Sequence, residues 1–142
     1  MKRIILVLLF VLGFFIYPET SIAHDTAKTE MVMVDLSPNK PVHRLFPLTI
    51  LSIDGESVTH RNESIMLATG KHTLKFSANV NLKFFTGNIK ILNANIKQRK
   101  YSDTLIVSLE ANNHYQLAFD ARPAKVEDWK PIVLSVTKKD IK

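Results

Sequence analysis

Cysteine is absent from the 142 residues of the sequence. The protein therefore has no disulfide bonds, and an apolar core must supply its stability. Attachment of a lipid at a lipobox cysteine is excluded as well, so we predict that the protein is not a lipoprotein. A cysteine nucleophile is excluded for the same reason.

Glycine and catalytic motifs are scarce. The four glycines leave no glycine-rich loop of the kind that binds phosphate groups. The sequence also lacks the Gly-x-Ser-x-Gly turn that presents a serine nucleophile. Glu127 and Asp128 are adjacent acids, and adjacent residues of a strand point to opposite faces, so they cannot work as a paired acid and base. We therefore predict a protein that is not an enzyme and carries no cofactor.

Long apolar runs are confined to the N-terminus. Two basic residues precede Ile4–Ile16, a run of 13 residues without charge that is shorter than the about 20 residues of a membrane-spanning helix. Ser21-Ile22-Ala23 then places small residues where a signal peptidase reads them. We predict a signal peptide at 1–23 that is cleaved after Ala23, and an uncleaved anchor is the alternative. The mature protein is then periplasmic or secreted from a bacterium and is not an integral membrane protein.

Acidic residues are outnumbered. Without the predicted leader, and so without Lys2, Arg3 and Glu19, 119 residues remain with 17 basic and 12 acidic side chains, a net charge of +5. Such a charge favours anionic partners such as lipid headgroups, cell-wall polymers or acidic proteins. Simple solubility is the alternative explanation. An exported protein seldom meets nucleic acid, so we expect no nucleic-acid partner.

Helical spacing of apolar residues is also rare. After a polar stretch at 24–30, which we expect to be flexible, apolar residues alternate with polar ones or form short runs bounded by turn signals. These patterns predict strands. The expected strands are 31–36, 46–54, 64–67, 72–77, 103–110, 114–120 and 129–136. We therefore predict an all-β fold, a single small antiparallel β-sandwich of about eight strands and immunoglobulin-like layout over 31–142.

Two details of this prediction concern turns and the middle of the chain. Asp54-Gly55 is a dipeptide that adopts positive backbone angles in tight turns. After 72–77, the alternation is expected to continue to Phe84, with Phe84 facing the core and Phe85 the other side. Gly87-Asn88 is expected to close a hairpin, with 89–92 as its returning strand and 93–100 as a polar connection or edge.

The segment "LTILSIDGESV…SIMLATGKHTLKF" resembles a known pattern. It has a strand, an Asp-Gly turn, a second strand, and then Leu-x-x-Gly-x-His-x-Leu leading into a third. This pattern is similar to PEGA-type β modules of bacterial envelope proteins and to the first part of the YccT family, periplasmic proteins implicated in inhibiting curli synthesis. The matching positions are Asp54, Gly55, Leu67, Gly70, His72 and Leu74. The resemblance implies a β fold, an envelope location and a non-enzymatic role.

The candidate binding residues are five cations near the Gly87 turn together with one aromatic side chain. Within 18 residues the sequence places Lys83, Lys90, Lys97, Arg99 and Lys100. Phe85 is expected to be exposed beside Lys83, where it would contact a glycan, an anionic headgroup or an acidic partner. The alternative is that the lysines only protect an edge strand from association with other sheets.

The histidines offer a second hypothesis. After cleavage, His24 would carry the free amino group, and its amine and imidazole together would chelate Cu(II). A second histidine, His43, His72 or His114, would complete the site. The alternative for His72, which lies in "LATGKHTLKF", is a hydrogen-bonded residue at the start of a strand.

The leading interpretation is a non-catalytic exported protein that binds an envelope protein, an anionic polymer or a membrane surface. A periplasmic Cu(II) carrier is the alternative. The sequence leaves the oligomeric state open.

Overall fold

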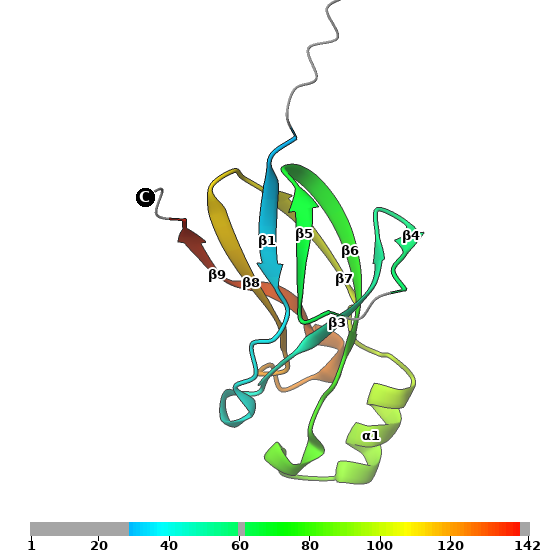
Figure 1. Ribbon diagram of the computed structural model, residues 1–142. Helices are drawn as coiled ribbons and strands as arrows, with labels where there is room; N and C mark the ends of the chain where they lie inside the picture. The colour runs from blue at the N-terminus through cyan, green and yellow to red at the C-terminus, as the bar shows by residue number, and fades with distance from the viewer. Residues whose placement is uncertain (1–28, 60–61, 140–142) are drawn as a thin grey trace, which may run out of the picture.

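The computed structural model describes residues 29–59 and 62–139 (Figure 1). The predicted signal peptide at 1–23, most of the segment 24–30 and the last three residues of the predicted domain lie outside the described residues. Within the described part, the strands form two sheets, and a single short α-helix accompanies them. The predicted all-β class is thereby confirmed.

The first sheet contains five strands in the order β2-β8-β1-β5, with β9 also paired to β8. Its strands are β1 (Met31–Asp35), β2 (Leu45–Phe46), β5 (Ser64–Ala68), β8 (Asn113–Asp120) and β9 (Lys130–Lys138). β1 and β8 run parallel, with Met33 opposite His114 and Asp35 opposite Gln116. The prediction of a wholly antiparallel fold is wrong for this pair. Alternation cannot reveal strand direction, because the side-chain period is two in parallel and antiparallel pairs alike.

The second sheet contains four strands in the order β4-β3-β6-β7. These are β3 (Leu48–Ile53), β4 (Glu56–Ser57), β6 (Gly70–Ala78) and β7 (Thr104–Leu109). The predicted turn between the first two is confirmed: Asp54 and Gly55 join β3 to β4 with φ angles of 51° and 89°. Glycine accepts such an angle without strain, and aspartate is among the few other residues that adopt it readily.

Side chains from both sheets form one hydrophobic core. Leu74 and Phe76 of β6 are buried, as their alternation with polar neighbours predicted. The same holds for Tyr115, Leu117 and Phe119 of β8. The two short connections η1 (Pro41–His43) and η3 (Val126–Asp128) are 3-10 turns. The single strand predicted at 46–54 is wrong, because this stretch is divided between β2 of the first sheet and β3 of the second.

Residues 79–103 connect β6 to β7, and they contain helices where strands were predicted. The part that precedes Asp103, residues 79–102, is called the α1 segment below. η2 (Leu82–Phe84) is a 3-10 turn, and α1 (Ile89–Lys97) is an α-helix. The predicted strand through Phe84, the hairpin at Gly87-Asn88 and the returning strand at 89–92 are therefore wrong. Figure 1 shows α1 at the end of the molecule away from the start of β1.

Asn88 and two apolar residues explain the helix. The side-chain oxygen of Asn88 accepts a hydrogen bond from the backbone N–H of Ile91 at 3.3 Å, which caps the first turn. Leu92 and Ile96 lie four residues apart, share one side of the helix and pack against the core. The short alternation of Ile89 and Ile91 with polar neighbours was the misleading signal. No helix in the described part of the chain has the length and apolar character needed to cross a membrane.

Candidate functional site

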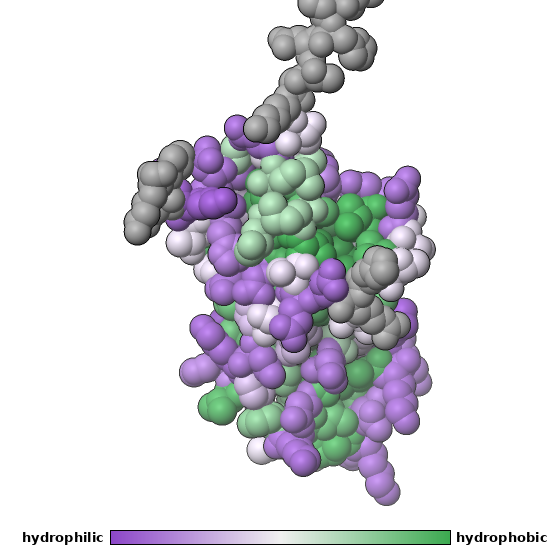
Figure 2. All heavy atoms as spheres, viewed as in Figure 1, coloured by the Kyte–Doolittle hydropathy of each residue, from purple (hydrophilic) through white to green (hydrophobic). Residues whose placement is uncertain are grey.

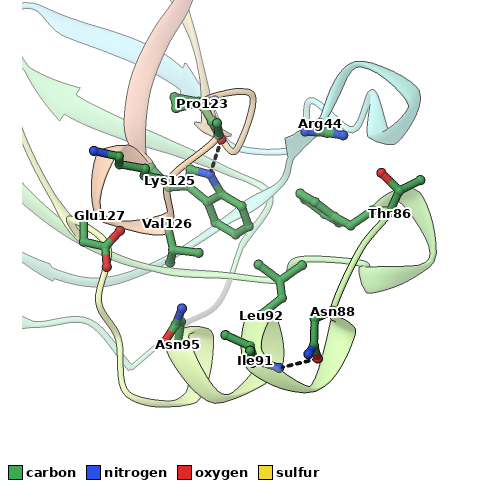
Figure 3. Close-up of a pocket in the computed structure, with 13 residues that line it drawn as sticks. Arg44, Thr86, Asn88, Ile91, Leu92, Asn95, Pro123, Lys125, Val126 and Glu127 are labelled. Atoms are coloured by element: carbon green, nitrogen blue, oxygen red, sulfur yellow. Dashed lines mark hydrogen bonds between the residues drawn. The ribbon is translucent and has the colours of Figure 1, made fainter.

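A pocket of about 340 Å³ lies where the α1 segment meets the loop that precedes β9 (Figure 3). Phe85 and Trp129 contribute its aromatic rings, Arg44 and Lys125 its cations, and Glu127 its carboxylate. The pocket therefore combines segments that are far apart in the sequence, which is why sequence patterns did not reveal it.

The aromatic side of the pocket holds the α1 segment to the sheets. The ring of Phe85 stacks on Phe46 with centroids 6.0 Å apart and lies 5.2 Å from the ring of Trp129. The indole N–H of Trp129 donates a hydrogen bond to the carbonyl oxygen of Pro123 at 2.8 Å. Trp129 is buried and belongs to the core. Such aromatic contacts contribute about 0.5–1.5 kcal/mol beyond the area they bury.

Arg44 also contacts the ring of Phe85. Its guanidinium carbon lies 5.0 Å from the centroid of Phe85, a cation–π contact. Arg44 adopts a left-handed backbone conformation with φ of 55°, and its backbone carbonyl accepts a hydrogen bond from the N–H of Ala121 at 3.0 Å. This local geometry, and not a sequence motif, brings Arg44 to the site, so no pattern could have identified it.

The sequence prediction for Phe85 is wrong. Strand alternation placed Phe85 in solvent and Phe84 in the core, whereas Phe85 packs against the core and Phe84 is 39% exposed. The reason is η2, in which successive residues turn by about 120° instead of alternating between two faces. The exposed aromatic side chain beside the lysines is therefore Phe84.

The five predicted cations are all exposed and all belong to the α1 segment. Lys90 and Lys97 lie seven residues apart on α1 and therefore project from the same side of the helix. Arg99 follows the helix in a left-handed conformation with φ of 50°. Among residues 29–59 and 62–139, no carboxylate forms a salt bridge with any of the five. None of them lines the pocket in Figure 3, whereas Phe85 does.

The positive charge of the α1 segment belongs to a longer stretch of the sequence that has no acidic residue. Between Glu63 and Asp103 the sequence contains no aspartate or glutamate and seven lysines or arginines. Two of these cations, Lys71 and Lys75, are exposed on β6, and Lys75 lies 3.7 Å from Asp103. The remaining five belong to the α1 segment, which contains no acid, although Asp103 follows it directly and Glu127 lies beside it in the pocket.

His72 is bonded through both ring nitrogens. Nδ1 lies 2.7 Å from the carboxylate of Asp54, and Nε2 lies 2.8 Å from the carbonyl oxygen of Ala68. The carbonyl and an ionised carboxylate only accept hydrogen bonds, so the ring makes both bonds at once when both nitrogens carry protons, and this geometry favours the imidazolium form. Partial burial lowers the pKa of His72, but the hydrogen bonds to Asp54 and Ala68 outweigh this effect, so the pKa is raised above its ordinary value.

These bonds leave His72 without a free lone pair for a metal. His24, the other predicted Cu(II) ligand, lies outside the described residues, and the Cu(II) hypothesis for it stays a prediction. Within residues 29–59 and 62–139, no three side chains of His, Asp or Glu come together as a metal site. His72 acts here as the partner of a turn carboxylate, because Asp54 also accepts a hydrogen bond from the backbone N–H of Thr73 at 2.7 Å.

Three carboxyl groups have lowered pKa values, and each has a structural partner. The backbone N–H of Thr73 and then the ring of His72 lower the pKa of Asp54. The guanidinium of Arg122, 2.8 Å away, lowers the pKa of Asp120. Burial raises the pKa of Asp35, but the hydrogen bonds from Ser37 and Gln116 lower it further than burial raises it. These three groups stay ionised at neutral pH and do not lie in the pocket.

No family model matches the chain, and no curated protein and no solved structure matches it. The resemblance to PEGA-type modules and to the YccT family therefore stays a prediction from the quoted motif.

Proposed function

We propose that the protein is a non-catalytic, exported β-sandwich that binds the anionic lipid surface of a bacterial envelope through its α1 segment. The observation that carries this proposal is the exposed basic surface of the α1 segment, with five cations and no acidic residue. Each lysine or arginine near an anionic membrane contributes about 1 kcal/mol of attraction. Export by the predicted signal peptide would bring the protein to such a surface.

Exposed apolar side chains favour a membrane over a bare polymer as the partner. Phe84 is 39% exposed and Ile91 is 59% exposed, and both lie within two residues of a lysine. Apolar groups beside cations bind at the boundary between headgroups and acyl chains, where each kind of side chain finds a suitable environment. A soluble anionic polymer offers contacts to the cations alone.

The remaining structure fits a scaffold role. The two packed sheets present the α1 segment at one end of the molecule (Figure 1), and the aromatic contacts of Phe85 hold it there. The carboxyl groups with lowered pKa values all have structural partners, so they support no acid–base chemistry.

Vesicle sedimentation tests the proposal. The full chain should bind phosphatidylglycerol-containing vesicles and not phosphatidylcholine vesicles, and binding should weaken as salt screens the charges. The triple variant Lys90→Glu, Lys97→Glu and Lys100→Glu should bind at least about 100-fold more weakly, since three cations each lose about 1 kcal/mol.

The matched control is Lys40→Glu, Lys71→Glu and Lys138→Glu, which changes the net charge equally at exposed sites outside the α1 segment. It should bind nearly as well as the unmodified protein. Equal losses in the two triple variants would show that net charge alone drives binding. Stronger binding to polyphosphate in solution than to vesicles would assign the surface to a polymer instead.

A further inference from the structure

Apart from Met1, the sequence has three methionines, and all three line one hollow on the first sheet. Met31, Met33 and Met66 line a hollow of about 270 Å³ together with His114. Methionine normally fills gaps in a hydrophobic core, but these three are 53%, 47% and 52% exposed. Figure 2 shows the pale-green patch that lies over β1 and β5 on this face.

Strand pairing brings these side chains together. Met33 of β1 lies directly opposite Met66 of β5 on one side and opposite His114 of β8 on the other. Met31 is two residues before Met33 and therefore points to the same face of the sheet. In an antiparallel pair such as Met33 and Met66, the Cβ atoms lie about 4.5–5.5 Å apart. Neighbouring strands are about 4.7–4.9 Å apart, which also brings His114 close to Met33, so the thioethers and the imidazole can converge on one point. We call Met31, Met33, Met66 and His114 the Met–His cluster.

The imidazole of His114 provides a second observation at the hollow, independent of the methionines. Its Nε2 atom is buried and has no hydrogen-bond partner among the described residues. A buried polar atom without a partner costs free energy, and native structures seldom leave one in place without a reason. In the tautomer that carries its proton on Nδ1, Nε2 has a lone pair that a metal ion would satisfy.

The kinds of donor in the hollow select the metal. Thioether sulfur is a soft ligand that selects Cu(I), and imidazole also binds copper. The lining contains no carboxylate, and the rest of it is Asn112, Asn113 and Lys139. The two amide groups are too few for Mg²⁺ or Ca²⁺, which require six or more oxygen ligands. Zinc sites likewise take thiolate, imidazole and carboxylate ligands and not thioethers.

We propose that the Met–His cluster is a binding site for Cu(I), with the thioether sulfurs of Met31, Met33 and Met66 and the imidazole of His114 as ligands. The site is independent of the α1 segment, which lies at the other end of the molecule (Figure 1). It also differs from a Cu(II) site at His24 in its metal and in its ligands.

Competition with a chromogenic Cu(I) chelator under anaerobic, reducing conditions measures the affinity of the full chain. We expect a 1:1 complex with a submicromolar dissociation constant. Even partners that only orient a metal ligand contribute about 10- to 100-fold in affinity, so Met33→Leu with Met66→Leu should weaken binding at least about 100-fold. Leucine has a similar volume at these exposed positions, and circular dichroism should show an unchanged fold.

Two control variants test whether histidines outside the hollow contribute to Cu(I) binding. His43→Asn changes an exposed histidine outside the hollow and should leave Cu(I) affinity unchanged, as should His24→Ala. His114→Asn should weaken binding by at least about tenfold. An unchanged affinity in the double leucine variant, or no submicromolar binding by the unmodified chain, would overturn the proposal.

Methionine-methyl NMR gives a readout that needs no variant. Ag(I), a stable substitute for Cu(I), should shift the ε-methyl signals of Met31, Met33 and Met66 at one equivalent. Shifts that are spread over histidine signals alone would contradict thioether ligation.

Discussion

The outer face of the first sheet and the α1 segment are both exposed, but their polar side chains are held in different ways. On the sheet, Ser135 donates a hydrogen bond to Gln116 at 2.8 Å, and Gln116 donates one to Asp35 at 3.1 Å. On the α1 segment, five cations extend into solvent without a salt bridge in the described part of the chain. Side-chain hydrogen bonds thus fix one set of side chains, while the cations of the α1 segment have no such partner in the described part of the chain.

This difference matches the two kinds of ligand that we propose. A metal ion needs donors at defined positions, and strand register holds the Met–His cluster in such positions. A lipid surface presents many mobile headgroups, and long flexible cations suit a partner that has no fixed geometry. The following predictions test how the α1 segment is held to the sheets and how much an ion pair of the sheets contributes to stability.

The largest effect is expected from the adjacent phenylalanines of the α1 segment. Phe85→Ala should lower the free energy of unfolding by roughly 2–3 kcal/mol, because a partly buried ring and its aromatic contacts are lost. Phe84→Ala should change it by less than about 0.5 kcal/mol, as expected for an exposed site. Urea denaturation measures both.

Vesicle binding should show the reverse order. Phe84→Ala should weaken vesicle binding, because an exposed apolar contact with the bilayer is lost. Phe85→Ala should weaken vesicle binding less, because all five cations and Phe84 remain. Equal destabilisation by the two variants would contradict the packing described here.

A smaller effect should follow from the cap of α1. Asn88→Ala removes the acceptor for the N–H of Ile91 and should cost about 1 kcal/mol. Asn88→Ser, which can still cap, should cost much less. Hydrogen exchange should increase in 91–97 and not in β6 or β7. Faster exchange throughout the sheets would mean that the helix and the sheets unfold as one unit.

The smallest effect concerns the ion pair of His72 with Asp54. The raised pKa of His72 gives stabilisation that is fully present below its ordinary value of 6.5 and is lost as the pH rises through the folded-state pKa. The lowered pKa of Asp54 gives stabilisation that is present above its ordinary value of 3.8 and is lost as the pH falls through the folded-state pKa.

The stabilising window of the pair therefore lies between these two ordinary values. The difference in unfolding free energy between the unmodified protein and His72→Gln should be larger at about pH 5.5 than at about pH 9. Urea denaturation at both pH values measures it, with His43→Asn as the control. A difference that is independent of pH would show that His72 contributes packing alone.

The sequence predicted the sheets better than the α1 segment, and the reason is physical. In β6 and β8, alternation directly reports burial, so Leu74 and Leu117 were placed correctly. In the α1 segment, Ile89 and Ile91 imitate a strand, and only the cap at Asn88 with the spacing of Leu92 and Ile96 indicates a helix. Because a strand period of two was assumed where the chain forms a 3-10 turn, Phe84 was predicted to be buried and Phe85 exposed, the reverse of what the structure has.

The candidate sites were predictable to different degrees. Exposure of the five cations follows from their chemistry and needed no structure. The contact of Arg44 with Phe85 depends on a left-handed residue, and the pairing of Met33 with both Met66 and His114 depends on strand order. Neither follows from local patterns, because residues distant in the sequence meet only through the topology.

The most direct test of the proposed function is a map of the lipid-binding surface by amide NMR. Nanodiscs containing phosphatidylglycerol should perturb the amide signals of residues 83–100 most strongly and leave β1, β5 and β8 nearly unchanged. Perturbations centred on β1 and β5, or an absence of perturbation by anionic nanodiscs, would contradict the assignment of membrane binding to the α1 segment.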